Sequence, residues 1–162
     1  MKKNKIIAVV LVAMMLMSLV VGCGKSNDTP AENPTTIAGK LEAQFVTEIA
    51  ADSNIENVAN KLTTNECLAD VSMIVMPMEP GYLNGFGEEI TGFNQAVIFC
   101  PMIRTIPFVG YIFETDDADA LVEELKVKAM LNWNICTQAD EMVVRTEGNT
   151  VFFVMAPNSF DE

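Results

Sequence analysis

The chain has 162 residues, carries 22 acidic against 10 basic side chains for a formal net charge of −12, and contains no histidine. So acidic a protein lacks the basic patch that displaces counterions from nucleic acid, and we expect no nucleic-acid partner. The missing histidine excludes Ser-His and Cys-His nucleophile pairs and the commonest zinc ligand, and the length is below that of two-lobed solute-binding proteins.

The first 22 residues have the three parts of a secretory signal peptide. Three lysines among the first five residues precede an uncharged apolar run over residues 6–21, and Leu19-Val20-Val21-Gly22-Cys23 reads as a lipobox. An uncleaved transmembrane anchor is the alternative, but a spanning helix needs about 20 apolar residues and this run is shorter. We therefore predict cleavage after Gly22 and lipidation of Cys23, with two acyl chains giving stable attachment where one is marginal.

Residues 23–36 are polar and contain two prolines, which predicts a flexible tether after the lipidated cysteine. Removing residues 1–22 takes three lysines and no acid from the net charge of −12, which leaves −15. The remainder, residues 37–162, is long enough to bury a core and is expected to form a single globular domain. The predicted location is the extracytoplasmic face of a cell membrane, with the lipid as the membrane contact.

Two helices are predicted at the start of this domain. Apolar residues recur every four positions from Ile37 to Ile49, after Thr36 as the cap, and Ile55 to Leu62 repeats an apolar face at helical spacing. Strands are then expected over residues 71–78, 96–102 and 109–114, with a glycine-rich loop at 82–93. This arrangement places a helical pair before a run of strands.

A longer helix is predicted to begin at residues 115–117, where acidic side chains suit the positive end of the helix dipole. Strands at 142–146 and 151–155 flank the turn Glu147-Gly148-Asn149, and the continuous apolar run of the second predicts a strand covered on both faces. The order α-α-β-β-β-α-β-β indicates an α+β fold: two N-terminal helices, then a largely antiparallel sheet of about five strands with one long helix packed on it.

Lipidation of Cys23 would leave Cys67, Cys100 and Cys136, of which at most two can form an intramolecular disulfide. We favour buried, inert thiols, and Cys67–Cys136 is the alternative because both flank elements. The chain has no Cys-x-x-Cys motif, although thiol-based redox work remains a further hypothesis.

Carboxylates offer little further chemistry. Glu88 and Glu89 in the glycine-rich loop are the only pair that we consider for an envelope hydrolase. Asp116, Asp117 and Asp119 lack the spacing of an EF-hand and are interpreted as helix-capping residues. No metal or cofactor site is predicted, and the sequence favours a binding protein over an enzyme.

A partner surface is predicted around Arg104, Phe108 and Tyr111 if the apolar segment 103–111 is exposed. We favour the alternative, that this segment is buried against the sheet. Trp133 has the same ambiguity, with Asn132 and Asn134 beside it as polar contacts for a ligand.

The lipobox and tether, together with three further phrases, resemble small uncharacterised lipoproteins of Gram-positive gut anaerobes. The phrases are Met78-Glu79-Pro80-Gly81, Thr105-Ile106-Pro107-Phe108-Val109-Gly110-Tyr111 and Asn132-Trp133-Asn134-Ile135-Cys136. The resemblance carries no known activity and implies an oxygen-poor exterior, where thiols persist. The leading hypothesis is a lipoprotein that binds or scaffolds an envelope protein or cell-wall partner at the cell surface.

Overall fold

The computed structural model describes residues 34–103 and 105–160, so the predicted signal peptide and Cys23 lie outside the described residues. Its helices are α2 (Ile37–Ala51), α3 (Ile55–Leu62), the 3-10 helix η1 (Glu66–Leu68) and α4 (Ala118–Lys128). No helix within these ranges is both long and apolar enough to cross a bilayer.

One antiparallel sheet holds most of the strands, in the order β1-β4-β5-β7-β6. These strands are β1 (Met73–Met78), β4 (Gln95–Pro101), β5 (Val109–Glu114), β6 (Glu141–Glu147) and β7 (Thr150–Ala156). The α+β fold and the antiparallel sheet are thereby confirmed. The glycine-rich segment differs from the predicted loop, because it contains the two-stranded sheet of β2 (Gly81–Tyr82) and β3 (Glu89–Ile90).

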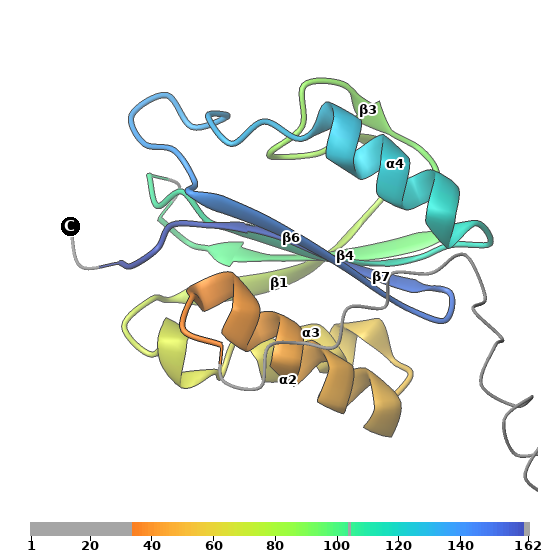
Figure 1. Ribbon diagram of the computed structural model, residues 1–162, viewed down its shortest axis with the longest axis horizontal. Coiled ribbons are helices and arrows are strands. Elements are labelled where there is room, and N and C mark those ends of the chain that lie inside the picture. The colour runs from red at the N-terminus through yellow and green to blue at the C-terminus, as the bar shows by residue number, and fades with distance from the viewer. Residues whose placement is uncertain (1–33, 104, 161–162) are drawn as a thin grey trace, which may run out of the picture.

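Both faces of the large sheet are covered (Figure 1). Helices α2 and α3 lie on one face, and α4 lies on the other with the segment that carries β3. Because side chains alternate along a strand, Phe152 and Val154 of β7 enter the core under α2 and α3, whereas Phe153 and Met155 enter the core under α4. The prediction of a strand buried on both faces is confirmed.

The helix starts follow from local chemistry. The Thr36 hydroxyl accepts a hydrogen bond from the Gly39 N–H at 3.1 Å, and Asn54 accepts one from Asn57 at 2.9 Å. The Asp117 carboxylate accepts from the Ala120 N–H at 3.1 Å, so its predicted capping role is confirmed. These side chains satisfy N–H groups that a helix leaves without a partner in its first turn.

The two ends of the sheet differ in character. At one, which we call the loop end, segment 102–108 joins β4 to β5 and segment 129–139 leads into β6. The Thr137 hydroxyl donates to the Thr105 carbonyl at 2.8 Å and joins these two segments. Helix α2 also begins at the loop end, since the Ala38 N–H donates to the Glu141 carboxylate at 3.3 Å.

At the opposite end, which we call the turn end, β5 leads into α4 and β6 turns into β7 (Figure 1). The Thr115 N–H donates to the Asn149 carbonyl at 3.0 Å, so the two connections are held side by side.

Candidate functional site

Two residues of the predicted partner surface belong to the core. Tyr111 is fully buried, its ring centroid lies 5.4 Å from that of Phe113, and its hydroxyl donates to the Asn84 carbonyl at 2.9 Å. Burial raises the pKa of Tyr111 far above its usual value. Phe108 is also buried, with ring centroids 5.9 Å from Phe99. Tyr111 is buried because β5 is the central strand and both of its faces are covered, and Phe108 directly precedes β5 and packs into the core under α2 and α3.

The remaining residues of the predicted partner surface are Arg104 and Trp133. Arg104 lies outside the described residues, and Trp133 is half-buried against the core under α4. Its neighbours Asn132 and Asn134 line a shallow hollow of about 410 Å³ together with Ile135 and Cys136. A ligand contact from these side chains therefore remains a prediction.

The loop end presents an apolar surface whose residues differ from those predicted, although Ile103 belongs to the predicted segment 103–111 and Leu131 and Ile135 flank Trp133. Met102 is 64% exposed, Ile103 62%, Leu131 40% and Ile135 100%. These four residues come from the two segments that Thr137 and Thr105 join, and we call them the loop surface. Scattered exposed apolar side chains are ordinary, but these four, with Met130 at 40%, are concentrated on two hydrogen-bonded segments at one end of the sheet, where a partner contact is expected.

The amino-acid composition of these two segments is a signal for the loop surface, although hydrophobic periodicity does not reveal it. Segments 102–108 and 129–139 include no Asp or Glu, although the chain has 22 such residues. A stretch without acids in so acidic a protein is the feature that could have identified the loop surface.

The Cys67–Cys136 bridge, the alternative to buried thiols, is not formed, although Cys136 is exposed and not buried as the favoured interpretation expected. Both residues are thiols, and Cys100 is likewise outside any disulfide. Cys67 packs against the core under α2 and α3, whereas exposed Cys136 belongs to the loop that leaves α4 on the other face of the sheet. The two cysteines therefore belong to different parts of the fold, one packed under α2 and α3 and the other in the exposed connection after α4.

The carboxylates considered for hydrolysis are both exposed. Glu89 lies on β3 opposite Tyr82, and its backbone carbonyl, not its side chain, accepts a 2.6 Å hydrogen bond from Lys128. Glu88 directly precedes β3 in a bend of the chain. The structure places neither carboxylate in the two hollows that it shows.

The larger hollow is a groove of about 780 Å³ along β6. Strand β6 is an edge of the sheet, and every one of its residues is only partly buried. The walls come from α4 on one side, Glu42 of α2 on the other and the β6–β7 turn at one end. Among residues 34–103 and 105–160, β6 pairs with β7 alone, and its outer edge runs along the groove.

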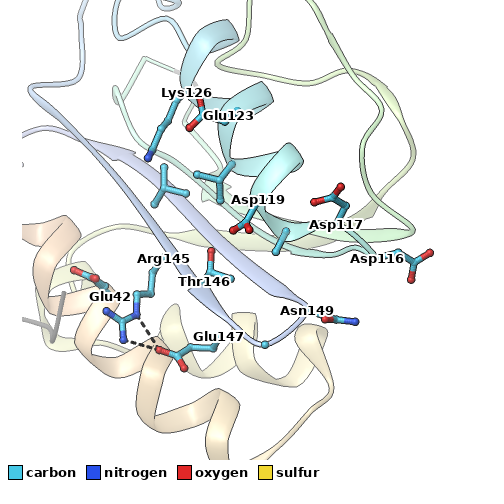
Figure 2. Close-up of a pocket in the computed structure, with 14 residues that line it drawn as sticks. Glu42, Asp116, Asp117, Asp119, Glu123, Lys126, Arg145, Thr146, Glu147 and Asn149 are labelled. Carbon is cyan, nitrogen blue, oxygen red and sulfur yellow. Dashed lines mark hydrogen bonds and ion pairs between the residues drawn. The ribbon is translucent and has the colours of Figure 1, made fainter. Parts of the chain in front are cut away.

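Acidic side chains dominate the groove. Figure 2 shows Asp119 of α4 on the same side of β6 as Thr146, whereas Arg145 and Glu147 lie on the side of Glu42. The alternation of a strand explains this division. Arg145 forms an ion pair with Glu147 at 2.7 Å. The lining acids are Glu42, Asp116, Asp117, Asp119, Glu123 and Glu147, against Lys126 and Arg145 as the cations.

One cluster fixes the helix that forms the wall of this groove. Glu124 accepts hydrogen bonds from the backbone N–H groups of Thr91 and Gly92, at 3.2 and 3.0 Å, and pairs with Lys128 at 2.8 Å. Burial raises the pKa of Glu124, but these donors outweigh it and leave the pKa below its usual range. Helix α4 is therefore tied to the segment beneath it.

No three potential metal ligands converge anywhere in the described ranges. No family model, curated protein or solved structure significantly matches the chain.

Proposed function

We propose that this protein is a lipid-anchored protein of the extracytoplasmic membrane face, and that its domain binds an envelope protein or cell-wall partner through the groove along β6. The observation that carries the binding role is the open edge of β6 at the base of a walled groove. The anchor rests on the lipobox that ends at Cys23.

The groove favours an extended, basic peptide segment as its ligand. An unpaired strand edge offers N–H and C=O groups to an added strand, and pockets beside it give specificity. The six acids that line the groove exceed its two cations, so basic side chains on the added strand meet complementary charge.

Hydrogen exchange with designed peptides tests the groove. The probes are a strand-forming peptide of alternating lysine and valine and a matched peptide of glutamate and valine, each added to the mature protein. The basic peptide should protect backbone amides within β6. The double variant Asp119→Asn/Glu123→Gln should lower the affinity for the basic peptide about tenfold. Each removed charge contributes about 0.2–1 kcal/mol at such sites.

The matched control is Glu56→Gln, which changes an exposed acid on α3 outside the groove. Equal protection by both peptides, or protection confined to β1, the other edge, would contradict the proposal.

Cell fractionation tests the anchor. With Cys23→Ser the protein should leave the membrane fraction, and its mass should lack a diacylglycerol group. The control is Cys136→Ser, which changes an exposed thiol of the folded domain and should leave the lipid in place. Membrane association of a Cys23→Ser protein from which residues 1–22 have been removed would count against lipidation at this residue.

A further inference from the structure

The loop surface is too apolar to be explained by the groove function. Met102, Ile103 and Ile135 are each more than half exposed, and they lie at the opposite end of the sheet from the β6–β7 turn. Exposed apolar clusters on a folded domain mark contact with a partner or a membrane. The position of this cluster relative to the start of α2 distinguishes these two.

Helix α2 begins at the loop end. The Ala38 N–H is bonded to Glu141, the first residue of β6, so the helix start is fixed beside the segment that carries Ile135. Cys23 precedes Ile37 by 14 residues, a length of chain that spans at most about 50 Å. The point at which a lipid anchor pulls on the domain therefore lies at the loop end.

This placement decides which end of the domain reaches a bilayer most readily. A seven-residue strand such as β6 is about 24 Å long. The turn end meets the bilayer only when the 14 residues run back along that length, whereas the loop end meets it directly. A surface next to the attachment point is held at high effective concentration, which favours even a weak contact.

The two segments of the loop surface also differ from the turn end in the number of acidic residues. The turn end carries Asp116, Asp117 and Glu147, while segments 102–108 and 129–139 contain no acid. The nearest acids along the chain, Asp140 and Glu141, accept hydrogen bonds from the backbone of Asn158 and Ala38. Exposed Asp70 also lies at the loop end, two residues before Ser72, whose carbonyl accepts a hydrogen bond from the Met102 N–H. The lack of acids is therefore a property of the two segments and not of the whole loop end.

We infer that the loop surface is a second membrane contact: Met102, Ile103, Leu131 and Ile135 insert at the lipid–water interface beside the anchor. The domain then stands with the turn end of its acidic β6 groove directed outward, toward a partner. The inference rests on the proposed lipid anchor. Its ligand is the interfacial region of the bilayer, where apolar side chains bury about 5–10 Å deep.

The single tryptophan of the chain is a built-in reporter, because Trp133 lies in the same loop as Leu131 and Ile135. The experiment uses the mature lipidated protein in phosphatidylcholine vesicles, with and without bromine on the acyl chains. Bromine quenches tryptophan only near the lipid tails. We expect brominated vesicles to lower Trp133 emission by about half, given insertion to interfacial depth.

The test variant is Met102→Ser/Ile103→Ser/Ile135→Ser, and it should abolish quenching while the protein still floats with the vesicles. These side chains are exposed, so the free energy of unfolding in urea should stay unchanged. The control is Tyr82→Ser, which removes a 76% exposed aromatic residue outside the loop surface and should leave quenching intact.

Vesicles containing anionic lipid should give weaker quenching, because they repel the acidic mature chain, and added salt should restore it. The mature chain has a net charge of −15, since removal of residues 1–22 takes three lysines from a chain with a net charge of −12.

Two outcomes overturn the inference. Flotation without quenching would mean that the anchor works and the loop surface is not on the membrane. Crosslinking between copies that depends on Ile135 would assign the surface to self-association instead. A protein that does not float at all would refute the lipid anchor rather than the loop contact, so the two failures are distinguishable.

Discussion

The ring of Phe99 lies against the backbone of Gly110, its cross-strand partner in β5. A Cβ atom at position 110 would overlap three atoms of that ring, so only glycine allows the close approach. Phe99 is fully buried, and its centroid lies 6.2 Å from that of Phe152. This contact sets the packing of β4 and β5 under helices α2 and α3.

Gly110→Ala should therefore destabilise the fold by about 1–3 kcal/mol, because the ring of Phe99 cannot move within a packed core without strain. Urea denaturation measures the free energy of unfolding. Gly87→Ala is the matched control, since the added Cβ there would meet only the flexible end of Met130. Similar losses for the two variants would refute this account of Gly110.

Thr115→Val should cost about 1–2 kcal/mol, because it keeps the shape of the side chain and removes its hydrogen bonds. Thr115 is 4% exposed, donates to the Gly92 carbonyl at 2.7 Å and accepts from the Asp117 N–H at 3.2 Å. Thr115→Ser retains the hydroxyl and should lose less stability. Urea denaturation measures the free energy of unfolding of both variants. A valine variant as stable as wild type would show that the hydrogen bonds of Thr115 contribute nothing to stability.

Glu124→Gln should lower the free energy of unfolding by about 1 kcal/mol at pH 7, because it removes the charge that pairs with Lys128. The pKa of Glu124 is lowered in the folded chain. Its stabilisation is therefore present above the unfolded pKa of about 4.3 and disappears as the pH falls through the lower folded pKa. The difference from wild type should shrink as the pH falls and vanish once Glu124 is protonated in the folded chain as well.

The measurement is urea denaturation at pH 7 and in acid, with Glu123→Gln as the control on the same helix. A Glu124→Gln deficit that is constant over this range would exclude an ionised Glu124 as its source.

Thiol alkylation followed by mass measurement should find three thiols in the mature domain and no disulfide. Cys136 is exposed and should react first. Burial raises the pKa of the Cys67 thiol, with the nearby charge of Lys40 acting against it, so Cys67 should react more slowly. Unfolding in urea should equalise the two rates, whereas detection of a linked Cys67–Cys136 peptide would contradict the structure.

Local pattern was sufficient for much of the fold. The four-residue repeat from Ile37 and the cap at Thr36 predicted α2, and the strand expected at 109–114 coincides with β5. The turn at Gly148 was also predictable, since its φ of +61° is a conformation that glycine adopts without strain. Each of these features depends on neighbours along the chain.

Phe108 and Tyr111 are buried, as the favoured interpretation of segment 103–111 expected, but the sequence alone left a partner surface there as an open alternative. An apolar segment with one cation has the same composition whether it is a surface or a central strand. Burial was decided by β4 and β7, which pair with β5 on its two edges, and by the segments that cover its faces.

By itself, the sequence predicted the α+β class, the order of the main helices and strands and the caps at Thr36 and Asp117, because periodicity and capping are local properties. Lipid attachment at Cys23 stays a prediction from the lipobox. Only the tertiary structure decided the strand order, which leaves β6 as an open edge, and the joining of two acid-free loops beside the start of α2. Those features arise from contacts between residues far apart in the chain, such as Thr105 with Thr137, which no local pattern specifies.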